Sequence, residues 1–284
     1  MRTYSSKNSD KRNNYKAVFV YFLLYIFIFY TNGYPENKCI SNTILNKVVS
    51  DTIFLYANQF RKQNFRDLFH RYKELDEVAR LYAEFLCNSN QFSHKTKQGF
   101  DVTDRVNIMT RRLFTSCTGE NLIKISGPTA SINTQNAYEK GKSMQLDWEK
   151  SSGHRKTLLD KDYNAIGIGV AFHSNAIIGV QVFAEIIAEL HEDFSFNQKT
   201  FQPDTVKIII YPHQYKKDYV VCLYQLLEKN DQITKMGCQT TQNVIINIPY
   251  QFTMKGLSFL YIKINDQVGV GPKFLCMSGT ESKR

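Results

Sequence analysis

The chain has 284 residues, of which 43% are apolar and 22% are charged, and it carries a formal net charge of +10. Its length suits about two domains, and its composition is that of a globular protein that can bury a core. The positive charge is spread along the chain without a run of five or six like charges, whereas nucleic-acid-binding proteins usually concentrate it on a stripe or helix. We therefore expect a mixed-charge surface and no nucleic-acid partner, and association with a membrane surface is left open.

Residues 1–33 have the pattern of a secretory signal. Residues 17–30 read AVFVYFLLYIFIFY, without a charge, and follow a basic and polar lead that ends at Lys16. Thr31 and Gly33 offer a point for cleavage. A membrane-spanning helix needs about 20 apolar residues, so this stretch is short for a permanent anchor. We predict that the chain is secreted, with an uncleaved signal-anchor in the membrane as the alternative.

The cysteines also indicate export. The six that follow the signal are Cys39, Cys87, Cys117, Cys222, Cys238 and Cys276. An even number in an exported chain is typical of disulfides, although the sequence does not choose among the many pairings. The absence of a C-x-x-C pair argues against a zinc knuckle and a thioredoxin-like redox site. Because three cysteines lie beyond residue 200, we expect one bridge in each part, Cys87 with Cys117 in the first and two of the last three in the second.

Three helices are predicted in the first part of the folded region, over residues 44–64, 72–88 and 136–150. The second has the clearest pattern, because its apolar residues recur at steps of three and four and form one stripe. These residues are Leu75, Val78, Ala79, Tyr82, Phe85 and Leu86. Between the second and third helices, the sequence predicts polar loops with short apolar pieces.

Two strands are predicted next. Residues 166–172 alternate apolar and small residues, and residues 177–190 form a second apolar run after a short polar turn, which is typical of a hairpin. Gly167 and Gly169 inside the first strand indicate close packing of a neighbouring element. With the helices around it, this hairpin predicts an α+β fold, an α-β-α sandwich over residues 44–187.

The last part of the chain has a different character. Short β-prone runs separated by polar turns follow one another from about residue 191 to the end. Several strands at short spacing predict a small antiparallel β-sandwich-like domain over residues 191–284.

The sequence contains none of the short catalytic or nucleotide-binding motifs that we searched for. His191 and Glu192 open like the zinc motif H-E-x-x-H, but the residue at the second histidine position is Ser195. No G-x-S-x-G elbow, P-loop or G-x-G-x-x-G is found. The informative segments are FSHK at residues 92–95, GENL at 119–122 and SSGHRKTLL at 151–159.

In this order, the segments resemble the CAP superfamily, the SCP-like domain shared by cysteine-rich secretory proteins, antigen 5 and plant pathogenesis-related proteins. The bacterial-type branch is the most similar, with an "AR" helix, F-S-H, G-E-N, W-x-x-S-x-G-H-R-x-x-L-L and a strand of I-G-V-G-V-A type. The counterparts here are VARLYAEFLCNSNQFSHK, TGENL and WEKSSGHRKTLLDKDYNAIGIGVAF. The resemblance covers residues 44–187 and implies an α-β-α sandwich whose cleft is lined by two histidines and two glutamates.

The resemblance assigns three cleft residues, His94, Glu120 and His154. Many eukaryotic members have the second glutamate three positions after a tryptophan, but here Ser151 stands three positions after Trp148, so the fourth member is absent or displaced. Two imidazoles and a carboxylate could hold a zinc ion with water in the fourth position. The alternative is a buried hydrogen-bond network that fixes the loops around the sheet.

For function, the resemblance implies a secreted, non-catalytic binding protein that acts in extracellular recognition or in lipid or sterol binding. Its partner would be a lipid, a sterol or an extracellular protein. The alternative is a hydrolase that uses the same cleft, either zinc-dependent or serine-type with Ser151 or Ser152 near His154. A third hypothesis is a surface protein whose C-terminal β-domain makes the partner contacts.

Overall fold

The computed structural model describes residues 39, 44–89, 91–129, 132–191, 204–211, 218–250 and 256–276. The predicted signal over residues 1–33 lies outside these residues, so the fold does not test it. Within the described ranges, no helix has the length and apolar character needed to span a membrane.

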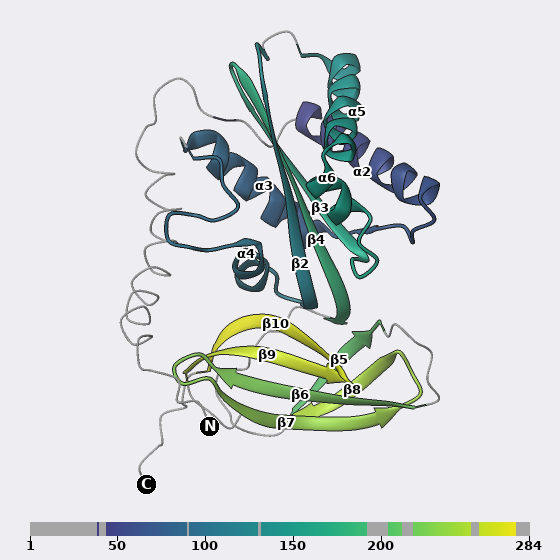
Figure 1. Ribbon diagram of the computed structural model, residues 1–284. Coiled ribbons are helices and arrows are strands. Elements are labelled where there is room, and N and C mark those ends of the chain that lie inside the picture. The colour runs from purple at the N-terminus through teal and green to yellow at the C-terminus, as the bar shows by residue number, and fades with distance from the viewer. Residues whose placement is uncertain are drawn as a thin grey trace, which may run out of the picture.

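The first part of the chain folds as three layers, which confirms the predicted α-β-α sandwich (Figure 1). The middle layer has the strand order β1-β3-β4-β2. These strands are β1 (His70–Arg71), β2 (Leu113–Ser126), β3 (Ala165–His173) and β4 (Ala176–Leu190). One face is covered by α2 (Ile44–Gln63), α5 (Thr134–Lys150) and α6 (Ser152–Leu158), and the other by α3 (Lys73–Asn88) and α4 (Val102–Met109).

Glycines in β3 bring α3 against the sheet. A Cβ atom added at Gly167 would lie 2.1 Å from the carbonyl carbon of Leu75, and one at Gly169 would lie 2.1 Å from that of Ala79. Because alternate residues of a strand face the same side, both glycines lie under the helix. The close packing predicted from these two glycines is therefore confirmed.

The opposite face of the sheet packs on α5. Trp148 is fully buried there, in a core cluster that also holds Met144. A Cβ atom added at Gly179 of β4 would lie 2.3 Å from the terminal methyl of Met144. Trp148 is thus a core residue of the sandwich, and its indole is not available as a surface platform.

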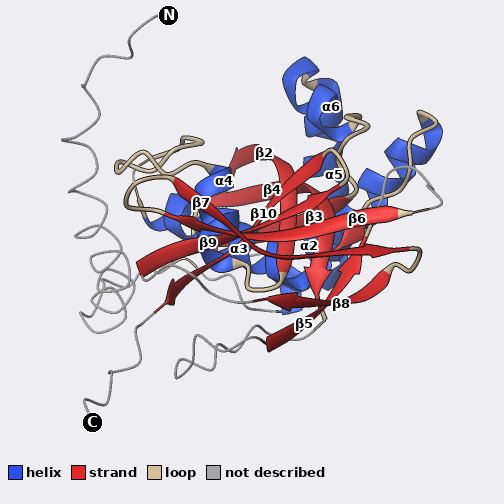
Figure 2. Ribbon diagram, turned by 90° about the horizontal axis from the view of Figure 1, so that it is seen from below, coloured by secondary structure: helices blue, strands red, loops and turns tan. Residues whose placement is uncertain are grey.

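The second part of the chain consists, in its described residues, of antiparallel strands, as predicted. They are β5 (Asp204–Ile210), β6 (Tyr219–Leu227), β7 (Gln232–Thr241), β8 (Ile245–Tyr250), β9 (Gly256–Ile264) and β10 (Gln267–Cys276). Four of them follow the order β10-β9-β6-β7, and β5 pairs with β8. The pair β5 and β8 lies side by side in both overall views (Figure 2).

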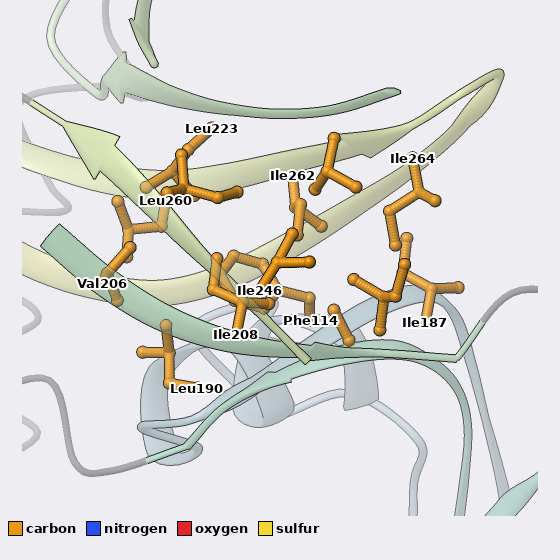
Figure 3. Packing of buried hydrophobic residues seen from close by; sticks show 14 of the residues in the cluster. Phe114, Ile187, Leu190, Val206, Ile208, Leu223, Ile246, Leu260, Ile262 and Ile264 are labelled. Atoms are coloured by element: carbon orange, nitrogen blue, oxygen red, sulfur yellow. The ribbon is translucent and has the colours of Figure 1, made fainter. Parts of the chain in front are cut away.

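Strands β2 and β4 of the sandwich continue into this β-rich part. Residues 188–190 of β4 pair with β5, and Thr115 of β2 pairs with Val270 of β10. Phe114 and Ile187 lie in one apolar core with residues of the second part (Figure 3). The described strands thus form a single ten-stranded sheet, and the two parts share buried surface.

The described residues include two disulfides, and one of them corrects a prediction. Cys222 pairs with Cys238, which confirms a bridge between two of the last three cysteines. In the first part, Cys87 pairs with Cys39 and not with Cys117. Cys87 lies in the last turn of α3, with the Cα atom of Cys39 6.0 Å away, whereas Cys117 is a half-buried thiol on β2 beside Glu185. The prediction failed because spacing along the chain does not reveal which cysteine lies next to the end of α3.

Two elements lie where the sequence predicted polar loops. Helix α4 starts from a capping box in which Asp101 accepts hydrogen bonds from Thr103 N and Asp104 N, and Asp104 accepts one from Asp101 N. Strand β2 has a register shift between Thr115 and Thr118 that interrupts its alternation. Short helices and irregular strands have weak periodic patterns, which explains why neither was predicted.

Candidate functional site

The three predicted site residues come from three different elements. His94 lies in the loop between α3 and α4, Glu120 on β2 and His154 on α6. His94 Nδ1 is 2.9 Å from Glu120 Oε2. The pKa of His154 is lowered, first by burial and then by the nearby charge of His94. The fold therefore brings His94 against Glu120, 26 positions further along the chain, whereas His154 is linked to His94 only through its charge.

Both oxygens of the Glu120 carboxylate have partners. Oε1 accepts a hydrogen bond from Arg105 Nη2, and Oε2 lies against the His94 ring. The side chains of Glu120 and Arg105 are only 2% and 6% exposed, whereas that of His94 is 59% exposed. Glu120 therefore forms a buried ion pair with Arg105, and the residue of this group that is exposed to solvent is His94.

Arg105 ties the histidine loop to the helical layer. Its Nη1 donates to the carbonyl oxygens of His94 at 3.3 Å and Phe100 at 3.2 Å. Its guanidinium lies 3.4 Å from the ring centroid of Tyr82, a cation–π contact. The Tyr82 hydroxyl donates to Ser93 O at 2.6 Å, and burial raises the pKa of Tyr82 to about 12, so it remains a donor at neutral pH. Arg105 was missed in the sequence because α4 was taken for a loop, and the only local sign was the Asp-x-x-Asp of its capping box.

A chain of amide side chains holds the second histidine segment. Asn121 Nδ2 donates to His154 O at 3.2 Å and to Gln181 Oε1 at 3.0 Å. Gln181 in turn donates to Gln145 Oε1 at 2.8 Å, and Gln145 donates to Glu149 Oε1 at 3.1 Å. Since successive residues of a strand face opposite sides, Glu120 supports the loop of His94 on one face of β2 and Asn121 supports α6 on the other.

Glu149 follows Trp148 directly and is the glutamate nearest to Ser151, the position expected for the fourth member. It ends the amide chain, and burial raises its pKa. Its hydrogen-bond partner is Gln145, and no hydrogen bond joins it to His94 or His154 in the described part of the chain. Glu149 therefore belongs to the support of α5 and not to the histidine pair.

The predicted zinc site can be compared with these contacts. Among the described residues, no group of three or more His, Cys, Asp or Glu side chains could hold a metal ion. Glu120 would have to leave Arg105 to become a ligand, and a buried guanidinium without its counter-charge is strongly unfavourable. A three-ligand site does not fit the side chains as they lie, and zinc binding stays a prediction.

A comparison with protein families agrees with the resemblance of these segments. Residues 55–183 match the family model described as CAP, the cysteine-rich secretory protein family. No curated protein matches the sequence. An outer surface protein from Borrelia burgdorferi is similar at a TM-score of 0.42 and 20% identity, over 52% of this chain and 99% of that one. An extracellular protein containing a SCP domain from Bacillus anthracis str. Ames gives a TM-score of 0.39 and 21% identity, over 49% of this chain and 40% of that one. Residues 55–183 therefore form a domain that matches the CAP family, and the rest of the chain lies outside this match.

Proposed function

We propose that the chain is an exported binding protein that recognises an extracellular ligand through the surface around His94 and His154 and does not transform it. The observation that carries this proposal is the environment of Glu120, whose two oxygens are engaged by Arg105 and His94. A general base or a metal-binding carboxylate needs an oxygen that faces the reactant or the metal. Glu120 acts instead as a support that fixes His94.

Export is supported by two features of the chain. Residues 17–30 form the apolar core of a secretory signal, and the structure holds two disulfides, which persist in oxidising compartments. The ligand is then a lipid, a sterol or an extracellular protein. Retention at the membrane through the N-terminal segment is the alternative to release.

A hydrolase in the same cleft has less support. A serine nucleophile needs a hydrogen bond to its histidine. Ser151 is the N-cap of α6 without a side-chain capping bond, Ser152 is exposed, and no hydrogen bond joins either hydroxyl to His154 in the described residues. A zinc-dependent reaction would require the three-ligand site that the contacts of Glu120 disfavour.

The test uses the chain recovered from the medium of a secreting host. It is compared with its His94→Ala/His154→Ala variant, and with His70→Ala as a control at an exposed histidine on β1. Zinc is titrated and then counted per chain after gel filtration, and lipids and sterols are extracted and identified by mass spectrometry. We expect no stoichiometric zinc in any of the three proteins, and we expect lipid or sterol carried by the parent and by His70→Ala to be reduced in the double variant.

One zinc ion per parent chain that the double variant loses, together with cleavage of ester or peptide substrates, would overturn the proposal. The same cleft would then be assigned to a hydrolase. Extracts without lipid or sterol from a chain that also binds no zinc would direct the search to extracellular proteins.

A further inference from the structure

The end of α2 has an unusual residue at its terminating turn. Arg66 N donates to Arg61 O at 2.9 Å and Phe65 N donates to Lys62 O at 3.2 Å, which is the Schellman arrangement. Phe65 occupies the left-handed position of this motif, with φ of +54°. Glycine or asparagine is usual there, because a side chain larger than hydrogen strains this conformation.

Phe65 does not compensate this strain by packing. Its side chain is 96% exposed, and Leu68, three residues further, is 50% exposed. Single exposed apolar residues are common on protein surfaces. A large aromatic residue that is both fully exposed and in a strained backbone conformation is uncommon. Residues with strained backbone conformations concentrate at sites that contact other molecules.

The loop that presents Phe65 is fixed by a buried arginine. The side chain of Arg61 is 1% exposed and donates to the carbonyl oxygens of Asp67, Leu158, Asp160 and Tyr163. Its guanidinium also lies 3.9 Å from the ring centroid of Phe69. Burial lowers the pKa of Arg61 to about 10, so it stays charged at neutral pH. The apolar tip is therefore held in place before it meets a partner, which reduces the entropy lost on binding.

Basic residues stand on both sides of Phe65 in the sequence. Lys62 is three residues before it and Arg66 follows it directly, and Arg66 Nε donates to Leu159 O at 3.0 Å, which joins the loop to the segment after α6. Residues 62–69 and 155–162 together expose five basic side chains and also hold three acidic ones. The basic ones are Lys62, Arg66, Arg155, Lys156 and Lys161, and the acidic ones are Asp67, Asp160 and Asp162.

We propose that the loop of residues 64–69 binds the surface of an anionic lipid bilayer, with Phe65 inserted at the level of the headgroups. Aromatic side chains are favoured at the membrane–water interface, and lysine and arginine next to them attract anionic headgroups. A projecting single ring next to a stretch with more basic than acidic side chains suits a bilayer, which needs no preformed pocket. The inference rests on the proposed function only in that export brings the loop to an outer lipid surface.

The single tryptophan of the chain makes the test direct. Trp148 is fully buried, so a tryptophan introduced by Phe65→Trp reports on the loop against a constant background. The matched control is Ile44→Trp, at a side chain 78% exposed at the other end of α2, roughly 30 Å away at about 1.5 Å per residue. Vesicles of equal parts phosphatidylcholine and phosphatidylglycerol are compared with vesicles of phosphatidylcholine alone, with brominated lipid as the quencher.

We expect a blue shift and quenching at position 65 with the anionic vesicles, much less with the neutral vesicles, and no change at position 44. In co-sedimentation, Phe65→Asn should lower vesicle binding about tenfold or more, since a buried aromatic ring contributes about 1.5–3 kcal/mol. This variant should melt no lower than the parent, because asparagine suits the left-handed position.

Three results would overturn the inference. The first is emission from position 65 that anionic vesicles leave unchanged, and the second is equal vesicle binding by the parent and Phe65→Asn. The third is a lipid-independent, concentration-dependent dimer that Phe65→Asn abolishes, which would assign the loop to a second copy of the chain.

Discussion

Replacement of Glu120 by alanine should lower the free energy of unfolding by about 3–5 kcal/mol, because it leaves a buried charge without its partner. Arg105 and Glu120 are 6% and 2% exposed, so water screens their pairing little. The other contacts of Arg105 are two carbonyl oxygens and the Tyr82 ring, which carry only partial charges. For a chain of this size, the loss corresponds to a melting temperature lower by roughly 6–20 °C.

Guanidinium unfolding followed by circular dichroism measures this loss, and two further variants test its cause. If the unpaired guanidinium is responsible, Glu120→Ala/Arg105→Met should lose at least about 1 kcal/mol less than the sum of the two single variants. The control is Glu77→Ala, which removes a pair with Arg80 on the surface of α3. Glu77 is 52% exposed, so we expect a loss of under about 1 kcal/mol there.

The reasoning is refuted if Glu120→Ala unfolds at the same guanidinium concentration as the parent. It is equally refuted if the losses of the two single variants add in the double variant. The first result would mean that Glu120 is not a support of the fold, and its carboxylate would again be a candidate for chemistry. The second would mean that the unpaired guanidinium of Arg105 is not the cause of the loss.

Two further predictions concern β3 and the thiol on β2. Gly169→Ala should prevent secretion of folded chain or lower its melting temperature sharply, because the new Cβ would lie 2.1 Å from a backbone carbon of Ala79. The control is Gly153→Ala on α6, where a new Cβ meets no atom of the described residues within 4 Å, and it should stabilise the chain by up to about 1 kcal/mol. The pKa of Cys117 is raised to about 11, mainly by burial and secondly by the charge of Glu185. Iodoacetamide at pH 8 should therefore label this thiol slowly in the folded chain and rapidly in urea, which peptide mass spectrometry can follow. Because the pKa of Cys117 in the folded chain lies above the ordinary value of 9.0, the protonated thiol contributes stability that is present below pH 9 and is lost as the pH rises through about 11. Fast labelling of the folded chain at pH 8 would contradict the placement of Cys117 as a half-buried thiol with a raised pKa.

The parts of the fold that were predicted from the sequence are those with a strong local pattern. The stripe of α3 has the helical period, and β3 and β4 are apolar runs separated by a short turn, so each follows from its own residues. The continuation of β4 beyond the sandwich could not be predicted in this way. Its last residues, 188–190, are as apolar as those before them, and only the folded chain shows that they pair with β5.

The contacts that support the predicted site residues could not be predicted from the sequence. His94, Glu120 and His154 stand in segments that resemble a known family, whereas Arg105 has no motif of its own. Its role depends on α4 packing beside β2, which brings its guanidinium to Glu120. A contact between two side chains from separate elements leaves no periodic signal in either of them, so it is visible only in three dimensions.

The position of Arg105 also changes what can be concluded from a glutamate that matches a family motif. A carboxylate that faced a cleft with a free oxygen would be under selection for its reaction or its metal. Glu120 is paired with Arg105 inside the protein, and the ring of His94 lies between its other carboxylate oxygen and the solvent. If Glu120→Ala is destabilised as predicted, the fold itself requires a glutamate at this position of the motif, whatever the cleft binds. The side chains through which this chain meets its ligand are therefore to be sought outside that ion pair, first at the two histidines and then on the surface around them.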